Sequence, residues 1–96
     1  MNNMTEARQQ VKYRTLCASL TDKQMQTVRT VSGRKVTALQ LADEWGVEIM
    51  TAQSRLVRLM DDGYLERERV GTASKWGALY EYSVTADTLE ALKGEA

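Results

Sequence analysis

Residues 37–65 read TALQLADEWGVEIMTAQSRLVRLMDDGYL, and this stretch has the clearest secondary-structure pattern in the chain. Its pattern predicts two helices joined by a tight turn and followed by a strand. Thr37 and Gln40 have the T-x-x-Q spacing of a capping box, in which the two side chains satisfy backbone donors at a helix start. Gly46 follows the last apolar residue of that helix, at the point where a left-handed residue ends a helix. Thr37 is therefore the predicted N-cap of a first helix that Gly46 terminates.

The second helix of the stretch is predicted from about Ile49 to Asp62, with Gly63 as its stop. At about 100° per residue, its side chains separate onto two faces. The face predicted to enter the core consists of Ala52, Leu56 and Leu59. The face predicted to meet a partner consists of Met50, Gln53, Ser54 and Val57.

This ordered spacing resembles the helix-turn-helix and first wing strand of winged-helix DNA-binding regulators, the MarR-like and ArsR-like group. Those families carry T-x-x-x-L-A, a Gly-Val turn, a recognition helix ending in L-x-x-L, and then x-x-x-G-L-I. The positions that match are Thr37, Leu41, Ala42, Gly46, Val47, Thr51, Leu56, Leu59, Gly63 and Leu65. The positions that depart from the family pattern are Glu48, Gln53 and Ser54. With the following hairpin, the resemblance covers about residues 21–85 and implies a mainly α fold with a small β-hairpin wing, a winged helix-turn-helix.

The segment before this core predicts an amphipathic helix over residues 5–20. Its apolar positions recur at helix-compatible spacing and are Val11, Leu16 and Leu20. Cys17 is the only cysteine, which excludes an internal disulfide, and a lone thiol in a helical pattern is predicted to be a buried small hydrophobe. Thr21 and Gln24 form a second capping box, which predicts another helix up to Ser32 and Gly33. A short edge strand is predicted at 34–36.

Beyond Gly63, residues 64–70 and 78–84 are rich in β-forming residues and predict a hairpin. The face of its second strand that should pack on the helices consists of Tyr80, Tyr82 and Val84. Thr85 is predicted to cap a last helix over residues 86–94. The apolar positions of this helix and its stop are Leu89, Leu92 and Gly94.

The composition predicts one domain over residues 1–96. The chain has 96 residues, of which 43% are hydrophobic and 27% charged, and no proline or low-complexity stretch marks a boundary. No apolar run approaches the roughly 20 residues of a membrane helix, and the first ten residues lack the order of a secretion signal. We therefore expect a cytoplasmic protein without a membrane partner.

The charges total zero but are unevenly distributed. Residues 1–35 contain seven Lys and Arg side chains against Glu6 and Asp22, a net charge of +5, so the remainder carries −5. A neutral total argues against indiscriminate nucleic-acid binding, because phosphate neutralisation supplies most of the non-specific affinity.

The side chains that enzymes and metal sites need are scarce. The sequence has no histidine, which excludes Ser-His and Cys-His nucleophiles and the commonest metal ligand. The acidic pairs Asp43–Glu44 and Asp61–Asp62 are sequence neighbours on helices, so their side chains diverge by about 100°. We predict neither enzyme activity nor a cofactor.

Groove recognition of double-stranded DNA is the predicted function, in the form of a small repressor-like transcriptional regulator. Gln53 can pair with adenine, Thr51 and Ser54 can bond bases or phosphate, and Met50 or Val57 can pack on thymine methyls. Arg58 lies at the flank of that face and is a candidate for phosphate or guanine. Arg55 lies nearer the core edge, where the alternative is an ion pair with Asp43 or Glu44.

The resemblance adds contacts on either side of this helix. Lys35 and Thr37 correspond to a backbone clamp before the first helix of the pair. Lys75 and Trp76 at the wing tip can reach phosphates or the minor groove, and the alternative for Trp76 is packing on the hairpin.

Two further expectations concern partners. The apolar stripes of the terminal helices predict a homodimer, as the resemblance also implies, and a dimer would read a palindromic site; their alternative is packing within the domain. The alternative function is a winged helix that binds protein and not DNA, which the neutral charge and the outward Met50 and Val57 also suit. The sequence does not identify a small-molecule effector.

Overall fold

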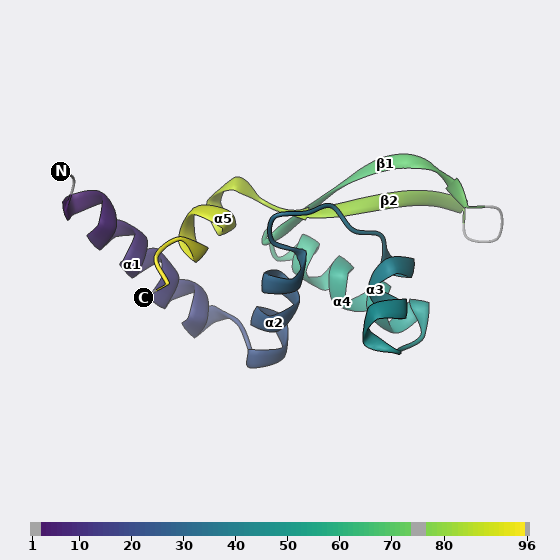
Figure 1. The fold of residues 1–96 in the computed structure, drawn as a ribbon, viewed down its shortest axis with the longest axis horizontal. Helices are drawn as coiled ribbons and strands as arrows, with labels where there is room; N and C mark the ends of the chain where they lie inside the picture. Colours follow the sequence, from purple (N-terminus) through teal and green to yellow (C-terminus); the bar gives the residue numbers. More distant parts are fainter. Residues whose placement is uncertain (1–2, 74–76, 96) are drawn as a thin grey trace.

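The computed structural model describes residues 3–73 and 77–95 (Figure 1). The elements follow in the order α1 (Asn3–Ser19), α2 (Asp22–Val31), α3 (Ala38–Trp45), α4 (Ile49–Asp61), β1 (Leu65–Ala73), β2 (Gly77–Val84) and α5 (Ala86–Leu92). The terminal helices α1 and α5 lie together at one end, and the antiparallel hairpin β1–β2 extends toward the other end beside α3 and α4. Within these ranges, no helix combines the length and the apolar character that crossing a bilayer requires. The predicted mainly α architecture with a hairpin wing is confirmed.

Both predicted capping boxes are formed. The Thr21 hydroxyl accepts from the backbone N–H of Gln24 at 3.1 Å, and Gln24 Oε1 accepts from the N–H of Thr21 at 3.0 Å. Thr37 and Gln40 repeat the arrangement at 3.1 and 2.8 Å. Each box satisfies two backbone donors, so α2 and α3 begin where the local sequence predicts.

The turn between α3 and α4 depends on a glycine. Gly46 has a φ of 65°, in the left-handed region that a Cβ disfavours. Glu48 is the N-cap of α4, but its side chain makes no capping hydrogen bond. The α4 helix ends within one residue of the predicted Asp62.

The hairpin has its predicted inner face. Pairing begins with Leu65 opposite Val84 and is irregular between Arg69 and Gly71. The β2 residues that pack on the helical core are Tyr80, Tyr82 and Val84. The predicted edge strand at 34–36 shortens to Val36, which exchanges backbone hydrogen bonds of 2.9 and 2.7 Å with Tyr82. The strand is shorter than predicted because Arg34 still belongs to the turn that ends α2, where its N–H donates to the carbonyl oxygen of Val31 at 3.2 Å.

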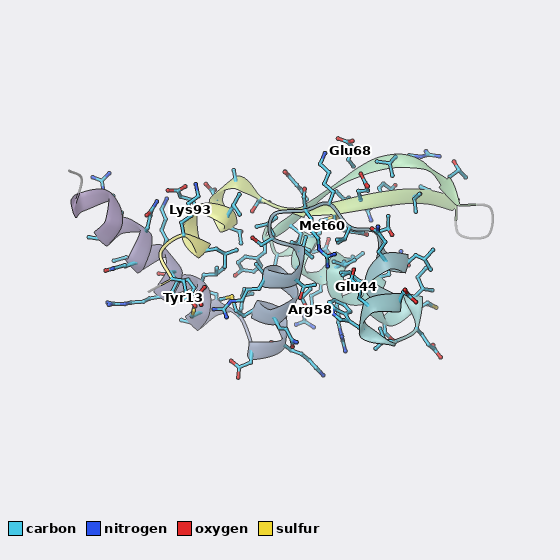
Figure 2. The ribbon with its side chains drawn as sticks, viewed as in Figure 1. Tyr13, Glu44, Arg58, Met60, Glu68 and Lys93 are labelled. Carbon is cyan, nitrogen blue, oxygen red and sulfur yellow. The ribbon has the colours of Figure 1, made fainter. Side chains whose placement is uncertain are left out.

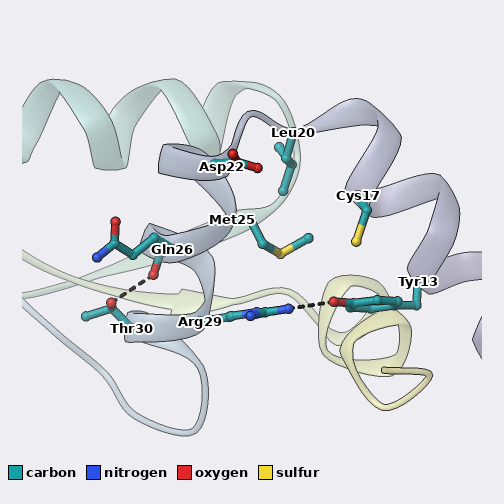
Figure 3. Close-up of a pocket in the computed structure, with 8 residues that line it drawn as sticks. All are labelled: Tyr13, Cys17, Leu20, Asp22, Met25, Gln26, Arg29 and Thr30. Carbon is teal, nitrogen blue, oxygen red and sulfur yellow. Dashed lines mark hydrogen bonds between the residues drawn. The ribbon is translucent and has the colours of Figure 1, made fainter. Parts of the chain in front are cut away.

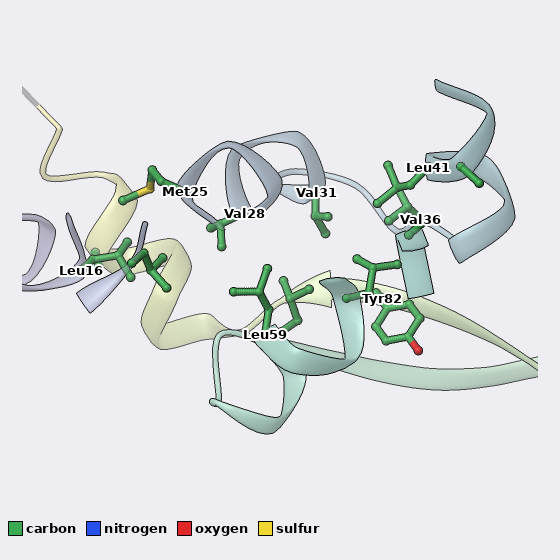
Figure 4. Packing of buried hydrophobic residues seen from close by; sticks show 14 residues of the cluster. Leu16, Met25, Val28, Val31, Val36, Leu41, Leu59 and Tyr82 are labelled. Carbon is green, nitrogen blue, oxygen red and sulfur yellow. The ribbon is translucent and has the colours of Figure 1, made fainter. Parts of the chain in front are cut away.

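The inward face of α4 lies at the centre of the hydrophobic core. Ala52 and Leu56 have no exposed surface and Leu59 is 1% exposed, which confirms the predicted inward face. These side chains belong to one cluster with Val28 and Val31 of α2 (Figure 4). Burial along a whole face fixes the rotation of α4 about its axis.

The α1 helix is less embedded than its sequence predicts. Leu16 and Leu20 are buried, but Val11 is 60% exposed. Cys17 is also exposed, so its predicted burial is wrong. Both residues line open grooves, Cys17 the one between α1 and α2 and Val11 one between α1 and α5.

The α5 helix buries small residues in place of leucine. Thr88 and Ala91 are its buried side chains, whereas the predicted apolar position Leu89 is 38% exposed and Leu92 is half-buried. Small side chains on α5 let its backbone approach α1 closely. With these small residues facing α1, Leu89 points outward.

Thr85 occupies the N-cap position of α5, but its hydroxyl makes no capping bond, contrary to prediction. The hydroxyl lies 2.8 Å from Thr88 Oγ1, 3.2 Å from the carbonyl oxygen of Gly63 and 3.3 Å from that of Tyr64. Thr85 therefore joins the start of α5 to the segment that follows α4.

Candidate nucleic-acid interface

The outer face of α4 is a row of exposed polar and apolar side chains. Met50 is 67% exposed, and Thr51, Gln53 and Ser54 are exposed as well. Val57 departs from the prediction in part, because it is half-buried and packs against the core cluster. The first two turns of α4 thus present a thioether, two hydroxyls and an amide on a helix that the core holds in place.

A narrow groove of about 70 Å³ separates α4 from the wing. Ile49 and Gln53 of α4 line it together with Leu39 of α3 and Leu79 of β2. Leu39 is 61% exposed, and no charged side chain lines the groove among the residues that the structure describes. This flank of α4 can make apolar contacts and, through Gln53, amide hydrogen bonds.

The other flank of α4 contains two arginines. The guanidinium carbon of Arg55 lies 5.3 Å from the centroid of the Trp45 ring, a cation–π contact. Arg58 is exposed and lies on the side of α4 that shares a groove with α2 (Figure 2). The sequence did not predict the Arg55–Trp45 contact, because it joins two helices across a turn and leaves no periodic signal.

The alternative ion pair of Arg55 with Asp43 or Glu44 is wrong. Glu44 receives two hydrogen bonds from Arg34, Nη1 to Oε2 at 3.0 Å and Nη2 to Oε1 at 2.8 Å. These bonds lower the pKa of Glu44 below its ordinary value. Asp43 forms no salt bridge among the residues that the structure describes.

The predicted backbone clamp precedes α3. Lys35 is exposed in the loop after α2. The Thr37 oxygen accepts the capping hydrogen bond, so its O–H group remains the part that could donate to a phosphate. The two predicted contacts at the wing tip, Lys75 and Trp76, lie outside the described residues.

Arg67, which was not predicted from the sequence to have a role, links the two strands of the wing. The guanidinium carbon of Arg67 lies 4.0 Å from the centroid of the Tyr80 ring, and Arg67 Nη1 donates to the Tyr82 hydroxyl at 3.3 Å. This hydrogen bond raises the pKa of Arg67 above its ordinary value. Cross-strand spacing could have suggested the contact, since Arg67 pairs with Tyr82 in the hairpin.

A separate open groove of about 640 Å³ lies between α1 and α2 (Figure 3). Tyr13 and Arg29 point toward one another across it, and Arg29 donates to the Tyr13 oxygen. Arg29 also pairs with Glu95 at 2.6 Å, which fastens the C-terminal segment to α2. A hydrogen bond with Cys17 is the main cause that raises the pKa of Tyr13.

A helix-turn-helix followed directly by an antiparallel hairpin is a winged helix, and this chain is a winged-helix protein. Among solved structures, a mutant of Lactococcus lactis ZitR has a similar fold, with a TM-score of 0.62 and 15% sequence identity. The match covers 77% of this chain and 49% of the ZitR chain, so the chain spans about half the length of that neighbour. No protein-family model matches the sequence, and no curated protein does. At this identity the likeness shows the fold alone.

Proposed function

We propose that this protein binds double-stranded DNA in a sequence-specific manner, with α4 in the major groove, and acts as a repressor-like transcriptional regulator in the cytoplasm. One observation carries the proposal: the exposed outer face of α4, rich in hydrogen-bonding groups, lies opposite a face without exposed surface. A helix held in this way presents its side chains at fixed positions, as base readout requires.

Each exposed side chain has a role in the proposal. Gln53 pairs with an adenine edge, Thr51 and Ser54 bond bases or phosphate, and Met50 packs on a thymine methyl, with Val57 as a further apolar contact. The predicted contacts to the sugar–phosphate backbone are Lys35, Thr37 and Arg58, with Lys75 and Trp76 from the wing.

We also propose a homodimer in which α1 and α5 of two copies meet. Leu16 and Leu20 are already covered within the chain, which leaves the exposed Val11 and Leu89 as the apolar contact. Two copies double the number of phosphate contacts and read half-sites about 34 to 36 Å apart on one face of the DNA.

Replacement of Gln53 by Ala tests base reading. After a preferred site is selected from random duplexes, Gln53→Ala should weaken binding to that site by about 1 to 3 kcal/mol and leave random DNA unaffected. Gln26→Ala removes an exposed amide from α2 and is the matched control. Equal weakening on both kinds of DNA would exclude Gln53 as a base reader.

Sedimentation equilibrium tests the dimer. The full chain at tens of micromolar should sediment as a dimer, and the double variant Val11→Glu with Leu89→Glu as a monomer. Val70→Glu, at a 44% exposed position on the hairpin, should remain dimeric. A monomeric wild type without DNA contradicts a preformed dimer.

A protein-binding winged helix is the second candidate, favoured by the high exposure of Leu39 and Met50. Titration against mixed genomic fragments at two salt concentrations separates the two functions. Affinity that falls steeply with salt indicates DNA, because phosphate contacts release counterions. No binding at either salt concentration contradicts the DNA proposal and favours the protein-binding function.

A further inference from the structure

The groove between α2 and α4 has a composition unlike that of the wing-side groove. Its volume is about 300 Å³, and its lining within residues 3–73 and 77–95 includes no carboxylate. The polar side chains that line it are Thr21, Lys23, Gln24, Thr27, Arg55 and Arg58. Three of these carry a positive charge, and the rest are hydroxyls or an amide.

None of the three cations forms a salt bridge within the part of the chain that the structure describes. Lys23 and Arg58 are exposed, and neither forms a salt bridge with any carboxylate in the described ranges. By contrast, Arg29 and Arg34 are occupied by Glu95 and Glu44. Free cations beside a recognition helix are the groups that neutralise DNA phosphates.

The third cation is held in place. Arg55 is half-buried, and its guanidinium lies over the Trp45 ring. A guanidinium stacked on an aromatic ring keeps its N–H donors at its edge for an oxygen acceptor. Arg55 is therefore oriented before any ligand arrives.

The amide of Gln24 is oriented in the same way. Its Oε1 accepts from the backbone N–H of Thr21 at 3.0 Å, so the NH₂ group remains for an acceptor in the groove. Phosphate oxygens accept hydrogen bonds and donate none at neutral pH, which suits a lining rich in donors.

The groove between α2 and α4 lies next to the outer face of α4. Thr51, Arg55 and Arg58 are spaced by four and three residues, so they form one row along α4 beside the outward Met50 and Ser54. A DNA strand whose bases meet the outer face would pass its phosphates along this row. The opposite, wing-side flank has no charged lining residue, so the contacts within the described residues are asymmetric.

We propose that the groove between α2 and α4 seats the sugar–phosphate backbone of one DNA strand, with Lys23, Arg55 and Arg58 in contact with its phosphates. The inference rests on the proposed function and adds α2 to the DNA-binding surface. It makes Lys23 and Arg55 contact residues, although neither lies on the outer face of α4.

The test compares salt dependence in two double variants that lose the same charge. Lys23→Ala with Arg58→Ala removes the groove cations, and Lys12→Ala with Arg14→Ala removes two exposed cations of α1. Each lost phosphate contact lowers the slope of log affinity against log salt by about 0.9, so the groove variant should lose about 1.8 per protomer. Between 50 and 200 mM salt, wild type should then lose about 12-fold more affinity per bound protomer than the groove variant does, which is about 150-fold for a dimer on its site. The α1 variant should follow wild type.

Three outcomes separate the claims. If wild type has no salt-dependent affinity for DNA, the proposed function fails and the groove inference falls with it. If wild type binds but the groove variant keeps the slope of the α1 variant, only the groove inference is overturned. Should the groove variant unfold by circular dichroism, the charge-conserving Lys23→Arg with Arg58→Lys must keep the wild-type slope, while Lys23→Gln alone must lower it by about 0.9.

Discussion

Gly94 packs directly against the backbone of Gln9. A Cβ on Gly94 would overlap the Gln9 carbonyl group and fall 2.7 Å from the backbone nitrogen of Gln10. The sequence marked Gly94 only as the stop of the last helix, but the structure adds a steric role, because only a residue without a side chain lets the C-terminal segment lie on α1.

The first prediction follows from this contact. Gly94→Ala should lower the free energy of unfolding by about 1 to 3 kcal/mol, since the methyl group meets backbone atoms that cannot rotate away. Urea unfolding measures the loss. Gly71→Ala is the control, because a Cβ there meets no atom within 4 Å. A Gly94→Ala protein as stable as the Gly71→Ala protein would contradict the packing of this segment on α1.

The two faces of α4 should respond oppositely to truncation. Leu56→Ala should cost about 2 to 5 kcal/mol of unfolding free energy, because the side chain has no exposed surface and leaves a cavity. Met50→Ala should change stability by less than about 0.5 kcal/mol, since Met50 is two-thirds exposed. DNA affinity, calculated for the folded fraction of each variant, should fall more for Met50→Ala than for Leu56→Ala. A large stability loss at Met50 would mean that the outer face is covered.

The features that sequence predicted correctly are local ones. A capping box needs residues only three positions apart, so Thr21 and Thr37 marked two helix starts without knowledge of the fold. Helical periodicity alone separated Leu56 from Gln53. Exposure of the α4 outer face was therefore predictable from about four turns of sequence.

The features that sequence missed depend on packing between distant segments. Cys17 has a core-like position in the pattern, yet it is exposed because it lines the open groove between α1 and α2. Arg55 and Glu44 have opposite charges and lie in neighbouring helices, but Trp45 and Arg34 are the partners that they contact. Which partner a charged side chain contacts depends on how distant segments pack in three dimensions. Residue spacing along the chain does not contain this information.

The Arg34–Glu44 pair should make stability depend on pH. Because the hydrogen bonds from Arg34 lower the pKa of folded Glu44, the stabilisation is complete above the unfolded carboxyl pKa of about 4.3 and is lost as pH falls through the lower folded value. Glu44→Gln should thus reduce the urea midpoint at pH 7, and its difference from wild type should shrink as the pH is lowered below about 4.3. Glu66→Gln is the control, because it removes an exposed carboxylate of β1 that forms no salt bridge within the described ranges. A difference that stays constant down to acid pH would argue against the pair.

The hydroxyl of Thr85 should stabilise the junction between the wing and α5. Thr85→Val keeps the shape of the side chain but removes the contacts to Gly63 and Tyr64, and we expect a loss of about 1 kcal/mol. Thr15→Val is the control, because that exposed hydroxyl bonds only within α1. Hydrogen exchange should locate the loss, with faster exchange of the Thr85 amide, which donates to Tyr64 at 3.1 Å. Unchanged exchange there would assign the hydroxyl no role in the junction.

The stacking of Arg55 on Trp45 also gives the protein an optical reporter. The sequence has two tryptophans, so Trp76→Phe leaves the indole beneath Arg55 as the sole such fluorophore. Indole emission shifts when a charge beside the ring moves or is neutralised. Arrival of a phosphate at Arg55 would therefore register as a change in intrinsic fluorescence, and occupancy of the groove between α2 and α4 could be followed in real time with unlabelled DNA.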